Sequence, residues 1–185
     1  MRSSVKFQKD IPRLLMQNLL YPAIFGTVLV LFIYKVFQHT FCENIADISN
    51  WWGLWALIHF SLSYLANERW KSDYNWKTFL LDSMEIIIIL FSFHFLGFSN
   101  IPASNPNYRF FYFTFLFSPI GQFLWTIFLS KDKMPRDLYF ILPIRFAIYF
   151  VGMILNNRFC GFDASAIILS FALTIWYIES SILFE

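Results

Sequence analysis

Long apolar runs separated by short polar connections make up the pattern of this sequence. A helix needs about 20 apolar residues to cross a bilayer, and six runs approach or reach that length. They cover about 14–37, 51–66, 78–98, 110–130, 138–155 and 164–184. The second run is short and the fifth is marginal, which implies tilted helices or a thinned bilayer there. The pattern therefore predicts an all-α polytopic membrane bundle of about six transmembrane helices, forming a single domain over 1–185.

The composition excludes several other classes of protein. The chain is 58% hydrophobic and 14% charged, whereas soluble domains average about 25% charged residues. A soluble core of this size could not bury the 25 phenylalanines together with the other large apolar side chains. The net charge of +2 is too small to indicate nucleic-acid binding. A membrane protein is the class that remains.

Six spans that alternate in direction would place the connections on two sides of the membrane. The basic residues are distributed unevenly between these two sides. One side carries ten of them: Arg2, Lys6, Lys9, Arg13, Arg69, Lys71, Lys77, Lys131, Lys133 and Arg136. The other side carries three: Lys35, which is expected to snorkel from the end of the first run, Arg109 and Arg158. Lys and Arg collect in the cytoplasmic connections of membrane proteins. The bias predicts a cell-membrane protein with both termini in the cytoplasm.

Tryptophans near the ends of the runs are typical of the aromatic belts found at membrane interfaces. Trp51, Trp52 and Trp55 are expected at the outer interface, and Trp70 and Trp76 at the inner one. We interpret all five as anchors that fix the depth of the helices.

Two acidic residues lie inside the third run. Asp82 and Glu85 are three residues apart, so they share one helix face with Thr78, Ile89 and Ser92. A carboxylate that faces lipid costs about 2.5 to 3.5 kcal/mol on insertion scales. This face should therefore be turned toward protein or water.

Other polar residues fall at a similar depth in the cytoplasmic half of neighbouring runs. Together they form a predicted intramembrane polar cluster: Asp82, Glu85, Gln122, Arg145 and Glu179. Arg145 is the expected partner of Glu85 or Asp82, because a guanidinium offers a planar fork to a carboxylate. Two interpretations stay open. The cluster either clamps the helices together or lines a cytoplasm-facing cavity for an ion, a proton or a small ligand.

Prolines and small residues should shape how these runs pack. Pro119 and Pro143 are expected to bend their helices beside Gln122 and Arg145, because proline removes a backbone hydrogen bond. In the last run, small residues recur at four-residue spacing, which predicts a close helix-packing face within the chain or, alternatively, an oligomer contact. These residues are Ala166, Ser170 and Thr174.

The cysteines and histidines say less about function than the polar cluster does. Cys42 and Cys160 both fall in outer connections, where an oxidising compartment would permit a disulfide, with unpaired thiols as the alternative. His59 and His94 are expected to be interior structural residues, since neither has a second metal ligand at helical spacing. The sequence contains no HExxH, GxSxG, phosphate-loop or dinucleotide-binding motif, so it predicts no metal and no cofactor.

Three functional hypotheses follow from these patterns. The first is a non-enzymatic multi-pass membrane subunit, acting as sensor, scaffold or channel-forming component. It would sit in the lipid bilayer, form a homo-oligomer and couple to a cytoplasmic protein, as in bacterial signalling or defence systems. The inner basic residues would face that partner: Arg69, Lys71, Lys77, Lys131, Lys133 and Arg136. The second is a small transporter or an ion or proton pathway through the polar cluster. The third is a lipid-modifying enzyme with Asp82 and Glu85 as its acid–base pair.

Overall fold

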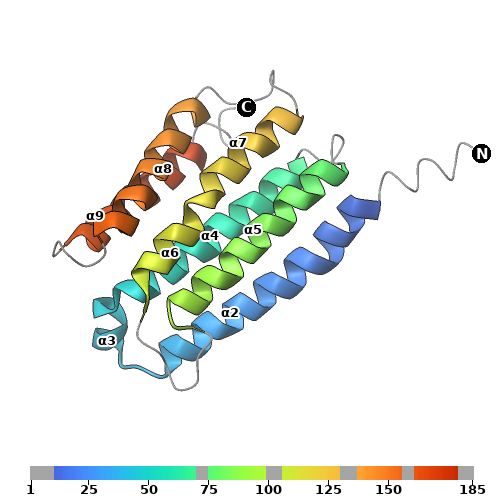
Figure 1. The fold of residues 1–185 in the computed structure, drawn as a ribbon. Coiled ribbons are helices and arrows are strands. Elements are labelled where there is room, and N and C mark those ends of the chain that lie inside the picture. The colour runs from blue at the N-terminus through green and yellow to red at the C-terminus, as the bar shows by residue number, and fades with distance from the viewer. Residues whose placement is uncertain (1–10, 70–74, 99–105, 130–136, 156–160, 179–185) are drawn as a thin grey trace, which may run out of the picture.

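All described residues with regular structure are helical. The computed structural model describes residues 11–69, 75–98, 106–129, 137–155 and 161–178. Its helices, drawn in Figure 1, are η1 (Met16–Leu20), α2 (Tyr21–Phe37), α3 (Phe41–Ala46), α4 (Ile48–Arg69), α5 (Trp76–Phe95), α6 (Tyr108–Phe115), α7 (Phe117–Leu129), α8 (Leu138–Leu155) and α9 (Phe162–Ile178). The prediction of an all-α fold is confirmed for these residues.

Within the described residues, three helices are long and apolar enough to cross a membrane. They are the continuous helix Ile11–Phe37, Trp76–Phe95 and Leu138–Leu155. The other predicted spans differ from simple membrane-length helices. The long helix α4 is less apolar, the fourth run is divided between α6 and α7, and α9 is a shorter apolar helix of 17 residues. The structure therefore supports membrane association. It does not confirm the predicted number of six spans.

The division of the fourth run has a local cause. The chain turns at Leu116, between α6 and α7, and Pro119 lies in the first turn of α7. Proline has no N–H to bond to the carbonyl of Phe115, and its ring crowds that carbonyl. Pro143, by contrast, lies inside α8 without ending it.

Successive helices run between two ends of one bundle (Figure 1). α5 packs beside α6 and α7, α8 beside α6 and α9, and α4 beside α2 and α9. At one end, the Lys77 Nζ lies 5.2 Å from the centre of the Phe128 ring, and the Trp176 Nε1 donates to Asp137 at 3.0 Å. At the other end, Tyr112 of α6 bonds to Asp163 of α9.

Large aromatic side chains fill the centre of the bundle. The Trp55 ring centre lies 5.7 Å from that of Trp52, 5.0 Å from that of Phe115 and 6.1 Å from that of Tyr149. Trp52 and Trp55 are fully buried, so the expectation that they anchor the outer interface was wrong. Trp51 is 41% exposed, because a shift of one residue turns a side chain by about 100° around the helix.

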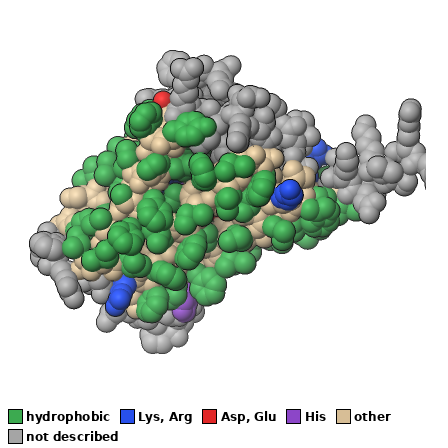
Figure 2. Space-filling view, turned by 45° about the horizontal axis from the view of Figure 1, so that its top comes forward, with side chains coloured by type: hydrophobic (Ala, Val, Ile, Leu, Met, Phe, Trp, Pro, Cys, Tyr) green, Lys and Arg blue, Asp and Glu red, His purple; other side chains and the backbone are tan. Residues whose placement is uncertain are grey.

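The surface of the bundle is strongly apolar. Figure 2 shows one face across which hydrophobic side chains are spread, with only scattered charged groups. Side chains such as Val30, Ile87, Phe140 and Ile168 are more than half exposed. Apolar surface that continues over several helices marks contact with lipid or with another protein.

Gly152 of α8 lies directly against the ring of Tyr112. A Cβ at this position would come 2.7 Å from two ring carbons, and the ring is held by Asp163 and packs against Trp52. We expect Gly152→Ala to lower the free energy of unfolding by about 2 kcal/mol. Gly121→Ala is the control: its Cβ meets nothing within 4 Å, so it should be neutral or stabilising. Equal losses in detergent unfolding would contradict this.

Candidate functional site

The acid-bearing face of α5 is turned into the bundle. The helix begins at a capping box in which Asn75 and Thr78 bond each other's backbone N–H groups. Thr78, Asp82 and Ser92 are buried, and the Glu85 side chain is 15% exposed. The predicted face is therefore the buried face of this helix.

His59 of α4 meets three polar side chains at one ring nitrogen. Its Nε2 lies 3.3 Å from the Glu85 Oε1. The same nitrogen lies 3.1 Å from the Ser118 Oγ and 3.2 Å from the Gln122 Nε2. The imidazole is buried and stacks on the Trp55 ring, with 5.1 Å between ring centres. A single buried imidazole thus connects α4, α5 and α7.

Arg145 continues this connection to two more helices. Its guanidinium donates through NH1 to the Gln122 Oε1 at 3.4 Å and through NH2 to the Thr174 Oγ1 at 3.1 Å. The Trp55 Nε1 also donates to the Thr174 hydroxyl, at 3.1 Å, and that hydroxyl donates to the Ser170 carbonyl. We call this set the polar network: Trp55, His59, Glu85, Ser118, Gln122, Arg145 and Thr174.

The structure brings three of the five residues of the predicted polar cluster together. Glu85, Gln122 and Arg145 are brought into the network, and Asp82 is buried about one turn before Glu85. Glu179 lies outside the described residues. The expected direct pair between Arg145 and Glu85 is replaced by a longer connection, since Gln122 and His59 stand between them.

Sequence reasoning missed the residue at the centre. The expectation that His59 lies in the interior is confirmed, but its place beside the acids is not predicted, although Trp52, Trp55, Ala56 and His59 follow helical spacing and share one buried face of α4. That spacing is the signal that could have placed it beside the acids. His94, which was also expected in the interior, is exposed near the end of α5.

The small residues of α9 form an internal face. Ala166, Ser170 and Thr174 are all buried, and α9 packs against α4 and α8. Of the two alternatives for these residues, the structure places them in contacts within the chain.

Three buried polar atoms beside Arg145 have no hydrogen-bond partner within the described residues. They are the Arg145 Nε, the Tyr149 hydroxyl and the Ser170 hydroxyl. Tyr149 lies one turn after Arg145 on α8, and both interact electrostatically. Leaving such a group unpaired costs about 1 to 3 kcal/mol.

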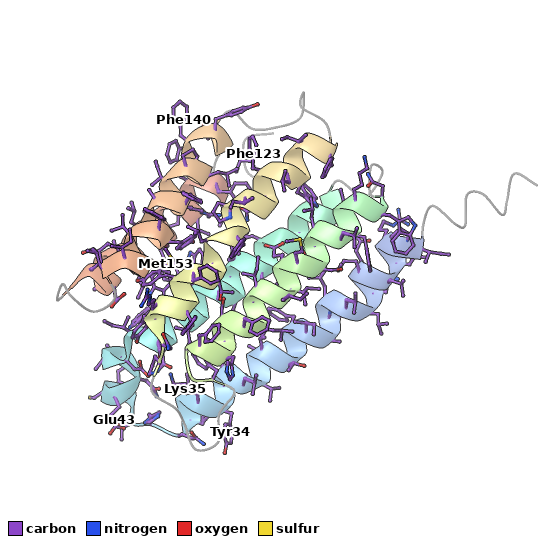
Figure 3. The ribbon with its side chains drawn as sticks, in the orientation of Figure 1. Tyr34, Lys35, Glu43, Phe123, Phe140 and Met153 are labelled. Carbon is purple, nitrogen blue, oxygen red and sulfur yellow. The ribbon has the colours of Figure 1, made fainter. Side chains whose placement is uncertain are left out.

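A second set of polar contacts lies at the end of the bundle where α2 ends. Lys35, expected to snorkel outward, is instead buried: its Nζ lies 3.1 Å from the Asp47 Oδ2 and 3.4 Å from the Leu96 carbonyl, and also bonds to Ser49. Figure 3 labels Lys35 at the end of α2, far from Phe140. The ammonium thus joins α2, α4 and the end of α5.

Asp47 is held ionised by this arrangement. Burial alone would raise the pKa of Asp47, but hydrogen bonds from Ser49 and the charge of Lys35 outweigh it and leave the pKa below its ordinary value. A carboxylate with a lowered pKa stabilises the fold above its ordinary pKa, and this contribution is lost as the pH falls through the folded-state pKa.

We therefore expect Asp47→Asn to lower the free energy of unfolding by about 2 kcal/mol at neutral pH. The difference from the parent should begin to shrink below about pH 4, where the carboxyl of the unfolded parent takes up a proton, and should be lost below the lowered pKa of the folded state. Unfolding curves in detergent at several pH values would measure this. Glu43→Gln, at an exposed carboxylate in the same connection, should have a smaller effect. A difference that persists at low pH would contradict the role given to the charge.

The remaining candidate residues lie apart from the network. Cys42 is exposed, and Cys160 falls outside the described residues, so their predicted disulfide stays a prediction. Of the inner basic residues, Lys77 is exposed at the start of α5. The side chain of Arg69 and all of Lys71, Lys131, Lys133 and Arg136 lie outside the described part.

Comparisons with protein-family models, with curated proteins and with solved structures find no match to this chain.

Proposed function

We propose that the chain is a non-enzymatic, multi-pass integral membrane subunit that works as a sensor. A buried network of polar and titratable side chains, enclosed by an apolar surface, is the observation that carries this proposal. Intramembrane ionisable residues are costly to bury and usually mark functional positions. Because the network links five helices, a change at one side chain would alter contacts on all of them.

Six membrane-embedded segments, with both termini in the cytoplasm, form the topology that we propose. The three membrane-length helices would be joined by α4, by the divided helix α6–α7, and by α9. Helices that are short or interrupted can remain in a bilayer when neighbouring helices or local thinning compensate them. The ten basic residues on the side of the termini support the orientation.

Thiol labelling of intact and permeabilised cells tests this topology. In a Cys160→Ser variant, which leaves Cys42 as the single thiol, Cys42 should react with a membrane-impermeant maleimide in intact cells. A variant with Ser72→Cys, Cys42→Ser and Cys160→Ser should react only after permeabilisation. Labelling of Cys42 only after permeabilisation would reverse the orientation, and recovery of the protein in the soluble fraction would exclude membrane integration.

The sensor would form a homo-oligomer and pass its signal to a cytoplasmic protein through the inner basic connections. Cross-linking in native membranes tests the oligomer, and co-purification with mass spectrometry tests the partner. Lys131→Glu with Lys133→Glu should release the partner, whereas Arg109→Glu, on the opposite side, should not. Recovery of a lone monomer in gentle detergent would contradict this part of the proposal.

A proton or ion pathway is the second candidate. The contact between His59 and Glu85, together with the unpaired polar atoms beside Arg145, favours it, because chains of Glu and His side chains carry protons in membrane transporters. Purified protein in liposomes should then dissipate an imposed pH gradient, and Glu85→Gln should abolish that flux. No flux above that of empty liposomes would exclude this candidate.

A further inference from the structure

We infer that Arg145, Tyr149 and Ser170 form a binding site for a chloride ion. These side chains come from α8 and α9, which pack together and run in opposite directions (Figure 1). Arg145 contacts Thr174 across this pair of helices. One turn further along α8 and one turn earlier in α9, Tyr149 therefore lies beside Ser170. The site goes beyond the proposed sensor role, and its test does not depend on that role.

All three side chains are buried, and each carries a polar atom that lacks a hydrogen-bond partner within the described residues. The exposed fractions are 3% for Arg145, 1% for Tyr149 and 0% for Ser170. The unpaired atoms are the Arg145 Nε and the two hydroxyl oxygens. The hydroxyls lie close enough to interact, yet no hydrogen bond of ordinary geometry joins them. A bound acceptor would relieve the cost of burying these donors unpaired.

The Ser170 hydroxyl is not used by its own helix. Serine and threonine hydroxyls in helices often donate to the carbonyl oxygen four residues earlier. Ser92 and Thr174, which are also buried, do so, and so does Ser165 of α9. Ser170 makes no such bond within the described residues. Its hydroxyl is therefore turned away from its own backbone.

The Arg145 Nε is directed toward the same helix. In a planar guanidinium, the Nε–H and one N–H of NH2 lie parallel along one edge. NH2 donates to Thr174 of α9 at 3.1 Å, so the Nε–H also faces α9. One N–H and two O–H groups thus gather where α8 meets α9.

Arg145 also brings a positive charge to this place. Its hydrogen bonds go to the neutral side chains of Gln122 and Thr174. A buried charge is costly unless an opposite charge compensates it. Glu85 acts on the guanidinium, but from the NH1 side, where Gln122 and His59 stand between them. An anion at the Nε would compensate the charge from the other side.

The other acids near the site are further away along their helices. Asp82 is buried about one turn before Glu85 on α5. Asp163 is two turns from Ser170 on α9 and is bonded to Tyr112. The negative charges of these acids lower the affinity for an anion, so we expect chloride to bind in the millimolar range.

A chloride ion satisfies the three groups better than a water molecule does. Chloride can only accept, so it takes up all three hydrogens and leaves none unpaired. A single water molecule adds two hydrogens of its own but makes at most one bond to each of the three groups. Two hydrogens would then remain unpaired in the interior, which is costly. The excess of donors therefore favours an anion.

Thermal unfolding of the purified protein in lipid nanodiscs tests the site, with sodium gluconate replaced stepwise by sodium chloride at constant ionic strength. The wild-type midpoint should rise by roughly 4 °C and then level off. Tyr149→Phe and Ser170→Ala should each weaken chloride binding roughly tenfold, because each removes one donor to the anion. In gluconate alone, Tyr149→Phe should unfold at the wild-type temperature or above it, because it lacks a hydroxyl that is unpaired there.

Tyr139→Phe and Ser165→Ala are the matched controls. They remove exposed hydroxyls from the same two helices and should keep the full effect of chloride. Line broadening of the chloride NMR signal measures binding without unfolding and should be lost in Tyr149→Phe and Ser170→Ala.

Three results would overturn the site. The first is an equal wild-type midpoint in gluconate and chloride. The second is an undiminished chloride effect in Tyr149→Phe and Ser170→Ala. The third is an equal loss of stability of Tyr149→Phe in both salts, because the hydroxyl would then have a partner other than the anion. The sensor role is tested separately by cross-linking and co-purification, so either proposal can fail without the other.

Discussion

An Arg145→Ala variant should lose about 3 kcal/mol of its free energy of unfolding. The side chain is 3% exposed, so its removal leaves a cavity. Its loss also leaves the amide oxygen of Gln122 without its observed donor and takes a buried positive charge from the vicinity of Glu85. Equilibrium unfolding in mixed detergent micelles, followed by tryptophan fluorescence, would measure the loss.

Two further variants separate charge from geometry. Arg145→Lys should recover only part of the stability, because one ammonium cannot replace the planar fork that reaches both Gln122 and Thr174. In a double-mutant cycle, Arg145→Gln and Glu85→Gln should be coupled by about 1 kcal/mol although they are not in direct contact. Strict additivity would show that His59 and Gln122 transmit nothing between them.

The burial of the acidic face of α5 follows directly from the sequence. Asp82 and Glu85 have no tolerable position in lipid, and helical spacing adds Thr78 and Ser92 to the same side. The structure buries that side. This success depends on a large energetic penalty combined with a simple periodicity, and both can be evaluated without knowing any neighbour.

The partner of Glu85 could not be predicted in the same way. An arginine at similar depth is a strong electrostatic candidate, but depth along the membrane normal says nothing about which helices are adjacent. The bundle places α4 against α5, so His59 takes the position that charge alone gave to Arg145. The order of helices around a bundle depends on contacts between surfaces distant in sequence, which a single sequence does not reveal.

Lys35 shows a related difficulty. A lysine near the end of an apolar run usually extends its ammonium to the membrane surface. Here Asp47 and the Leu96 carbonyl, 12 and 61 residues further along the chain, provide acceptors that satisfy the charge inside the fold. The rule for an isolated helix fails because the chain returns to supply a local partner.

Trp55→Ala should cause the largest loss of stability in the core, about 4 kcal/mol, because deleting a buried aromatic ring leaves a cavity that its neighbours fill only in part. The Trp55 ring is fully buried and packs against His59, Phe115 and Tyr149. Its Nε1 also holds the Thr174 hydroxyl. The same unfolding experiment should show the lower stability.

Trp51→Ala provides the comparison within the same helix. Its ring is 41% exposed, and its Nε1 bonds only to the Ile45 carbonyl among the described residues, so its loss should cost about 1 kcal/mol or less. Trp55→Phe should fall between the two, because it keeps most of the packed ring and loses the hydrogen bond to Thr174. Similar losses for Trp51→Ala and Trp55→Ala would mean that the buried contacts of Trp55 with His59, Phe115 and Tyr149 stabilise the fold no more than the contacts of a half-exposed ring do.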